Sequence, residues 1–117
     1  MIFNSGKKGE NAAVSFLKKS GYKILERNYL KPYGEIDIIA KKGENIAFIE
    51  VKTRKSDLYG SPAEFVTVSK QKKIIKAALA YISENDIEAE FTFDIIEVHL
   101  DGKKIINLNH IKNAFYI

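Results

Sequence analysis

The 117-residue chain contains no cysteine, and this absence narrows the chemistry open to it. Without thiolates it can form no disulfide, no cysteine-ligated zinc or iron–sulfur site and no cysteine nucleophile, so any metal must be held by oxygen or imidazole ligands. Proline is scarce, with two residues, and hydrophobic residues make up 45% of the chain, which excludes a disordered or low-complexity protein. We expect a single domain over residues 1–117, because a chain of this length builds one hydrophobic core.

Long hydrophobic runs are also missing. No apolar segment approaches the roughly 18 residues of a membrane span, and residues 1–10 carry charges where a signal peptide needs an apolar stretch. We therefore expect a cytoplasmic protein with no membrane partner. Acidic residues are in the minority, with 15 against 19 lysines and arginines and a net charge of +4. A basic surface favours polyanions such as nucleic acid, although lysine-rich surfaces also serve solubility alone.

The spacing of hydrophobic residues predicts an α/β fold, with a mixed central sheet of about five strands flanked by helices. Helices are expected over residues 5–20, with Ser5 as the cap, and 67–83, and Ser61-Pro62-Ala63-Glu64 has the features of a further helix start. Strands are expected over residues 22–29, 35–40, 45–54, 91–100 and 103–108, the last as an edge strand followed by a short tail to residue 117.

The strands over residues 35–40 and 45–54 should form a hairpin whose register follows from its turn. If Gly43-Glu44 is a two-residue turn, Lys42 pairs with Asn45. The same count places Asp37 opposite Glu50, and Glu35 opposite Lys52.

Two carboxylates would then face each other across the hairpin. Directly opposed side chains lie about 5 Å apart at Cβ, so Asp37 and Glu50 should repel unless a cation lies between them. The residues around both acids are apolar on both faces of the strands, which predicts buried central strands, and a buried acid needs a partner. The alternative is an ordinary solvent-exposed hairpin face that carries cross-strand ion pairs.

A third carboxylate comes from the first helix. Glu10, Ala13, Val14 and Leu17 follow helical i, i+3, i+4, i+7 spacing, so Glu10 should lie at the core-facing edge and point toward the sheet. Several carboxylates without soft ligands suit Mg²⁺ or Mn²⁺, which complete their coordination with water and substrate phosphate. Asp37 and Glu50 would hold the metal, and Lys52 would orient the attacking water or stabilise the transition state.

At these residues the sequence resembles a known family. Gly34-Glu35-Ile36-Asp37 followed by residues 48–54, FIEVKTR, is similar to the metal-binding core of the PD-(D/E)xK nucleases, although Ile36 stands where that motif has proline. The more specific resemblance is to the YraN-like family of small bacterial proteins, predicted endonucleases similar to archaeal Holliday-junction resolvases. It covers nearly the whole chain, including Gly9-Glu10, Arg27-Asn28 and Lys70. Thr92 departs from the family, which commonly has arginine there.

The resemblance implies a restriction-endonuclease-like fold for a single nuclease-like domain. It also implies that Asp37 and Glu50 are metal ligands, that Lys52 is the catalytic lysine and that Glu10 is a helix-borne helper with metal-ligand character. Glu35 is expected to assist. Since junction resolvases work as dimers, a homodimer is a further expectation.

Several basic and polar groups are candidate contacts for nucleic acid. Lys70, Gln71 and Lys73 cluster at the start of the second predicted helix, where free backbone N–H groups also attract phosphate. Arg54 follows Lys52 on the same strand face and has the forked geometry that suits phosphate. These lysines could equally form a solvated helix face. Tyr33, in a loop beside the motif, could stack on a base or simply pack. No role is predicted for His99 or His110.

The sequence thus supports a leading hypothesis and two alternatives. The leading one is a Mg²⁺- or Mn²⁺-dependent nuclease that hydrolyses phosphodiester bonds in DNA, including branched or structured DNA. The first alternative is a noncatalytic nucleic-acid-binding module of the same fold. The second is a protein-interaction domain that pairs its edge strand over residues 103–108 with a partner.

Overall fold

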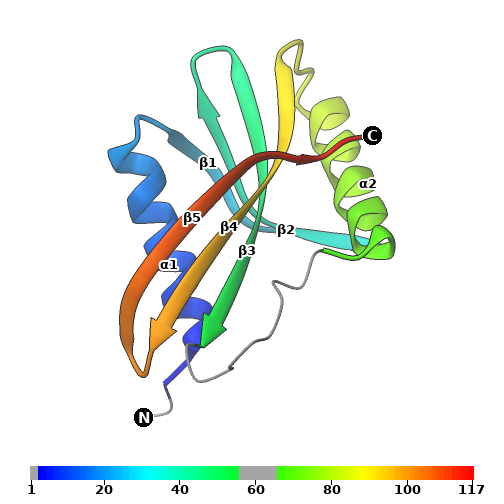
Figure 1. The fold of residues 1–117 in the computed structure, drawn as a ribbon. Coiled ribbons are helices and arrows are strands. Elements are labelled where there is room, and N and C mark those ends of the chain that lie inside the picture. The colour runs from blue at the N-terminus through cyan, green and yellow to red at the C-terminus, as the bar shows by residue number, and fades with distance from the viewer. Residues whose placement is uncertain (1–2, 56–65) are drawn as a thin grey trace.

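The computed structural model describes residues 3–55 and 66–117, which form two helices and five strands. Their order is α1 (Ser5–Lys19), β1 (Lys23–Lys31), β2 (Gly34–Lys42), β3 (Asn45–Lys55), α2 (Val68–Glu84), β4 (Glu90–Asp101) and β5 (Lys104–Phe115), as Figure 1 shows. Both long helices are confirmed to within one or two residues. The predicted helix start at residues 61–64 lies outside the described residues.

The five strands form one mixed sheet in the order β1-β2-β3-β4-β5. β3 and β4 run parallel, and the other three neighbouring pairs are antiparallel. A parallel pair needs a crossover connection, and α2 lies in the segment that links these two strands. This architecture confirms the predicted α/β class and is consistent with a restriction-endonuclease-like fold.

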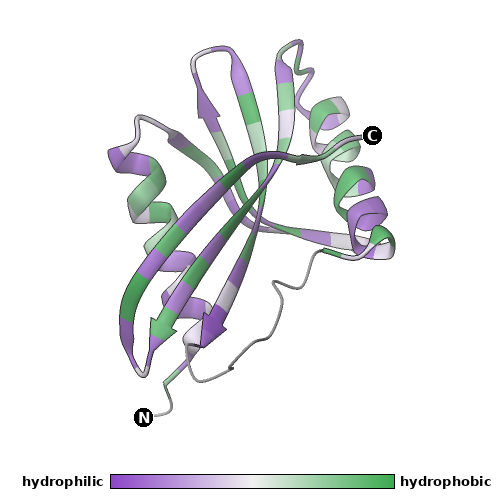
Figure 2. Cartoon of the chain, in the orientation of Figure 1, coloured by the Kyte–Doolittle hydropathy of each residue, from purple (hydrophilic) through white to green (hydrophobic). Residues whose placement is uncertain are grey.

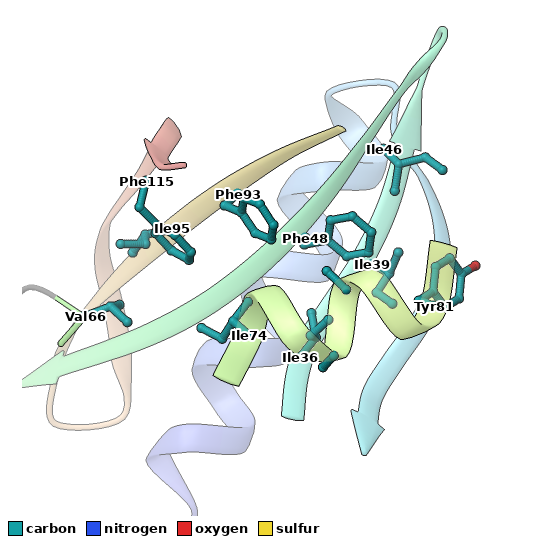
Figure 3. Packing of buried hydrophobic residues seen from close by; sticks show 12 residues of the cluster. Ile36, Ile39, Ile46, Phe48, Val66, Ile74, Tyr81, Phe93, Ile95 and Phe115 are labelled. Carbon is teal, nitrogen blue, oxygen red and sulfur yellow. The ribbon is translucent and has the colours of Figure 1, made fainter. Parts of the chain in front are cut away.

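The central strand β3 separates two hydrophobic cores because its side chains alternate between the faces of the sheet. Ile46 and Phe48 pack on the side of α2, where Figure 3 shows Phe48 close to the helix. Ala47 and Ile49 pack on the other side, with residues of α1. All four side chains are buried, so the prediction that this strand is central is confirmed.

The helix termini are set by capping groups and by glycine. The side chain of Asn4 accepts a hydrogen bond from the backbone N–H of Lys7, so Asn4 caps α1 in place of the predicted Ser5. At the other end, Gly21 adopts φ +91°, a conformation that ends a helix and that glycine adopts without steric cost. Among the described residues, no helix is long and apolar enough to cross a membrane.

The last strand is longer than predicted. Residues 109–115, expected as part of a tail, continue β5 and pair with β4 as far as Phe93 and Phe115. The prediction stopped short because residues 109–113 are mostly polar, although hydrophobic and hydrophilic residues alternate along β5 in Figure 2. β5 is an edge strand of the sheet, as predicted.

Candidate functional site

β2 and β3 pair at the turn end of their hairpin and separate toward the other end. The pairing runs from Lys42 and Asn45 to Ile38 and Ile49, which confirms the register expected from the Gly43-Glu44 turn. Beyond Ile38, β2 remains paired with β1, while β3 remains paired with β4. The candidate site lies at this separation.

Asp37 directly precedes Ile38, where the pairing of β2 with β3 ends. Here a side chain, not the backbone of β2, bonds to the backbone of β3. Its Oδ2 accepts a hydrogen bond of 2.8 Å from the backbone N–H of Val51. Asp37 and Glu50 lie just beyond the last paired residues, Ile38 and Ile49, so they do not pair in the ladder as expected, although the charge of Glu50 acts on Asp37. The expected pairing of Glu35 with Lys52 does not occur in the ladder, because the strands have already separated.

Glu50 is buried and carries a cationic partner. Its residue surface is only 5% exposed, and its Oε1 lies 2.7 Å from Nζ of Lys70. Lys70 belongs to the first turn of α2, which begins after the capping residue Thr67. Burial alone would lower the pKa of Lys70, but the hydrogen bond to Glu50 and the charge of that carboxylate outweigh burial and raise the pKa. The ammonium therefore stays charged and neutralises Glu50.

Asp37 has an unfavourable electrostatic environment. Burial, followed by the negative charge of Glu50, raises its pKa from 3.8 to about 7, against the opposing effect of the Val51 N–H. Glu10 and Glu35 raise the pKa further. Three other carboxylates thus act on Asp37, and two of them have cationic partners: Glu50 pairs with Lys70, and Glu10 pairs with Arg27. A position with this excess of negative charge favours an additional cation.

Glu10 reaches the same region from α1, as its helical spacing predicts. Its Oε1 accepts hydrogen bonds from Nη2 of Arg27 and Nδ2 of Asn28, both at 3.0 Å. These two β1 residues therefore orient Glu10 at the edge of the site. Their role was not predicted, because no local pattern connects a helix residue with a strand residue 17 positions away.

Two glycines allow the helices to come close to the sheet. A Cβ atom at Gly9 would lie 2.0 Å from Oγ1 of Thr53, so glycine lets α1 press against β3. A Cβ atom at Gly34 would lie 2.7 Å from the carbonyl oxygen of Lys73, so glycine lets the start of β2 meet the backbone of α2. The positions of Glu10 and Lys70 at the site depend on these two approaches.

The predicted residues line a shared hollow of about 330 Å³. Its lining includes six of them: Glu10, Glu35, Asp37, Glu50, Lys52 and Lys70. A smaller adjoining hollow of about 180 Å³ adds Lys73 and Ile74 beside Asp37 and Glu50. The structure therefore brings together residues from α1, β2, β3 and α2 that the sequence analysis assigned to one site.

Besides Lys70, which pairs with Glu50, two more predicted contacts for nucleic acid have other partners. Nε of Arg54 lies 3.6 Å from Oε2 of the largely buried Glu97 on the neighbouring strand β4. Nε2 of Gln71 donates a hydrogen bond of 2.9 Å to the carbonyl oxygen of Val66, just before α2. Neither side chain is among those that line the two hollows.

His110, for which no role was predicted, forms a buried polar pair on the opposite edge of the sheet. Its Nε2 lies 2.8 Å from Oδ2 of Asp94, whose Oδ1 accepts a hydrogen bond from the backbone N–H of Asn113. Both side chains are almost fully buried. This pair joins β4 to β5, and neither residue is among those that line the shared hollow.

The donor set at the hollow is compatible with a hard divalent cation. In residues 3–55 and 66–117, no three carboxylate or imidazole groups already lie close enough together to form a complete ligand cluster. Asp37 and Glu50 would supply two carboxylates. Mg²⁺ is commonly held by one or two protein carboxylates, with water and phosphate completing its coordination. The raised pKa of Asp37 shows that this place disfavours further negative charge, which a cation would offset.

Comparison with known proteins places the chain in a family. Residues 9–98 match the model of a family described as "Uncharacterised protein family UPF0102". The chain belongs to the UPF0102 family. This UPF0102 protein is 52% identical over 111 residues to a UPF0102 protein of Chloroherpeton thalassium, which covers 94% of this chain and 81% of that protein. It is 50% identical to a UPF0102 protein of Thermodesulfovibrio yellowstonii, over 95% of both chains.

Membership of UPF0102 confirms the resemblance to the YraN-like family. The segment of this UPF0102 protein that matches the family model runs from Gly9 to Val98. It therefore contains every residue named above as lining the two hollows, whereas His110 on β5 lies beyond it.

Proposed function

We propose that this protein is a Mg²⁺- or Mn²⁺-dependent nuclease that hydrolyses phosphodiester bonds in DNA, including branched or structured DNA. The observation that supports the proposal most strongly is the meeting of Asp37 and Glu50 where β2 and β3 separate. The pKa of Asp37 is raised to about 7 there, partly by the charge of Glu50. Strongly perturbed carboxylates in a hollow are typical of functional sites.

Each residue has a role that follows from its position. Asp37 and Glu50 would hold the cation, and Glu10 would take part from the edge of the hollow, where Arg27 and Asn28 orient it. The cation supplies Lewis-acid stabilisation of charge on the phosphate and lowers the pKa of bound water. Lys52 lines the same hollow and would orient the attacking water or stabilise negative charge on the phosphate.

Lys70 supports a second candidate function. Its ammonium already neutralises Glu50 at 2.7 Å, which is the arrangement expected of a site that needs no metal. A noncatalytic nucleic-acid-binding module would retain this ion pair and use the lysines of α2 to bind phosphate. Metal dependence separates the two candidates. A nuclease needs a cation that competes with Lys70 for Glu50, whereas the binding module keeps the ion pair and needs no metal.

The test uses labelled linear, flapped and four-way DNA substrates incubated with the purified protein and Mn²⁺. We expect cleavage by the wild-type protein, no cleavage in EDTA, and a loss of at least about 100-fold in rate for Glu50→Gln. Glu44→Gln is the matched control, because Glu44 lies in the exposed turn at the far end of the same hairpin. It should cleave like the wild type.

The result also decides between the candidates. Equal cleavage by Glu50→Gln and the wild type would reject the assigned site. DNA binding that weakens with salt, is insensitive to EDTA and is accompanied by no cleavage of any substrate would favour the binding module.

A further inference from the structure

A larger hollow adjoins the acidic site on the outer side of α2. It measures about 610 Å³ and lies between the turn that joins β1 to β2 and the exposed face of α2. This volume is within the usual range for small-molecule sites. Leu30, Pro32 and Tyr33 line it from the turn, and Lys72 and Lys76 line it from the helix. None of these five residues belongs to the acidic site described above.

Three lysines of α2 line the helix side of this hollow, and Glu35 lines it from β2. Lys76 lies four residues after Lys72 and three after Lys73, so on the helix it neighbours both, and all three line the hollow. Among the described residues, no carboxylate lies within ion-pair distance of these three lysines, whereas Lys70 is paired with Glu50. Three neighbouring ammonium groups that have no acidic partner within residues 3–55 and 66–117 favour an anionic ligand.

The turn side of the hollow offers apolar and aromatic surface. Leu30, at the end of β1, is 72% exposed and gives this side of the hollow apolar surface. Tyr33 packs partly against the hydrophobic core, and Nζ of Lys76 lies 4.9 Å from the centroid of its ring. The ring is thus held against the core, and the ammonium of Lys76 stands over one of its faces, which a stacked base would share with or take from Lys76. An aromatic surface beside ammonium groups suits a ligand that combines a flat base with a phosphate.

The hollow is continuous with the acidic site. Gly34 and Glu35 line both the large hollow and the smaller hollow that contains Asp37 and Glu50, and Lys73 does so as well. A ligand chain could therefore occupy both places at once, with one phosphate beside the carboxylates and the next groups beside Tyr33.

We propose that this hollow binds unpaired nucleotides of a DNA strand, with a base against Tyr33 and phosphates on the α2 lysines. The inference rests on the proposed nuclease function and names its substrate class: DNA with a single-stranded segment next to the cleaved bond, as in a flap, fork or overhang. The nucleotides must be unpaired, because a base in a duplex is stacked between its neighbours and neither of its faces is open to a tyrosine ring.

The experiment measures fluorescence anisotropy of a short oligothymidylate and of an abasic strand of the same length, both in EDTA. The two strands carry the same phosphates, so a difference in affinity reports contact with the bases. We expect the wild-type protein and Tyr33→Phe to bind the oligothymidylate about tenfold more tightly than the abasic strand, because one base stacked on an aromatic ring contributes about that much affinity. Tyr33→Leu, which keeps apolar bulk, should bind both strands equally.

A lysine pair tests the phosphate contacts. Lys76→Gln should weaken the binding of both strands and lower the salt dependence, expressed as the slope of log affinity against log salt concentration, by about 0.7. Lys18→Gln, in the last turn of α1, should change neither quantity, because α1 packs in the other core. Equal affinity of the wild-type protein for the two strands, or an unchanged preference in Tyr33→Leu, would overturn the proposal.

These measurements are independent of catalysis. If Mn²⁺-dependent cleavage is lost in Glu50→Gln but the wild type shows no preference for bases, the nuclease proposal stands and the nucleotide hollow is rejected. If the preference is present and follows Tyr33 but no substrate is cleaved, the hollow is supported as a DNA contact and the nuclease proposal is rejected.

Discussion

Replacement of Asp37 by asparagine should make the protein more stable at neutral pH while it removes the proposed activity. The Asp37 carboxylate is close to Glu50, and burial and that neighbouring charge raise its pKa to about 7. Asparagine is uncharged and similar in shape, and its Oδ1 can still accept the hydrogen bond that the Val51 N–H gives to Oδ2 of Asp37. The variant therefore removes the electrostatic cost and keeps the contact.

The sign and size of the effect follow from linkage between ionisation and folding. A carboxyl whose pKa is higher in the folded chain than in the unfolded chain holds its proton more tightly when folded, so its ionisation reduces stability. This cost is absent below the ordinary pKa of 3.8, grows as the pH rises to about 7, and is constant above that. At about 1.4 kcal/mol for each pKa unit, it reaches at most about 4 kcal/mol. Salt reduces the part that comes from Glu50.

The assay is urea denaturation of the wild-type protein and Asp37→Asn in EDTA at about pH 4, 6 and 8. We expect nearly equal free energies of unfolding at the lowest pH, and an advantage for Asp37→Asn that grows to a few kcal/mol at the highest. Asp101→Asn, an exposed residue at the end of β4, is the control and should show no such trend. Mn²⁺ should raise the melting temperature of the wild type at about pH 8 and leave that of Asp37→Asn unchanged.

Two outcomes would refute this reasoning. If the free energies of unfolding of Asp37→Asn and the wild type differ by the same amount at every pH, the Asp37 carboxylate titrates as it does in the unfolded chain. A variant less stable than the wild type at about pH 8 would show that the carboxylate is needed for folding rather than held at a cost.

Three further predictions concern the surroundings of the site. Gly34→Ala should lower the free energy of unfolding by about 1 to 3 kcal/mol in urea denaturation, because its new methyl group meets helix backbone that no side-chain rotation can clear. Gly6→Ala is the control and should be neutral or slightly stabilising, because the nearest atom to its new methyl group is 3.5 Å away. Equal effects of the two substitutions on stability would contradict the close approach of Gly34 to α2. Lys70→Met should bind Mn²⁺ more tightly in calorimetry, since the cation no longer competes with an ammonium for Glu50, and weaker binding would mean that Lys70 assists the metal. Asp94→Ala should lower stability by about 2 to 4 kcal/mol, because it removes the acceptor of the buried His110 side chain and of the Asn113 backbone N–H. The cleavage rate per folded molecule should not change.

The sequence alone was sufficient for features that depend on local geometry. The Gly43-Glu44 turn correctly predicts that Lys42 pairs with Asn45, because a two-residue turn determines the register of the residues next to it. Helical spacing correctly predicts that Glu10 lies at the core-facing edge of α1. The absence of cysteine limits the site to oxygen and nitrogen ligands.

The tertiary structure decided how those residues meet. β2 and β3 stop pairing at Ile38 and Ile49, so the Val51 N–H is free to bind the side chain of Asp37. α2 approaches the sheet closely at Gly34, which places Lys70 beside Glu50. Local sequence patterns record the period of a helix or strand, but these contacts join residues 14 to 39 positions apart and depend on how whole elements pack. The carboxylates and their spacing are therefore written in the sequence, whereas their charge partners and the raised pKa of Asp37 arise from packing.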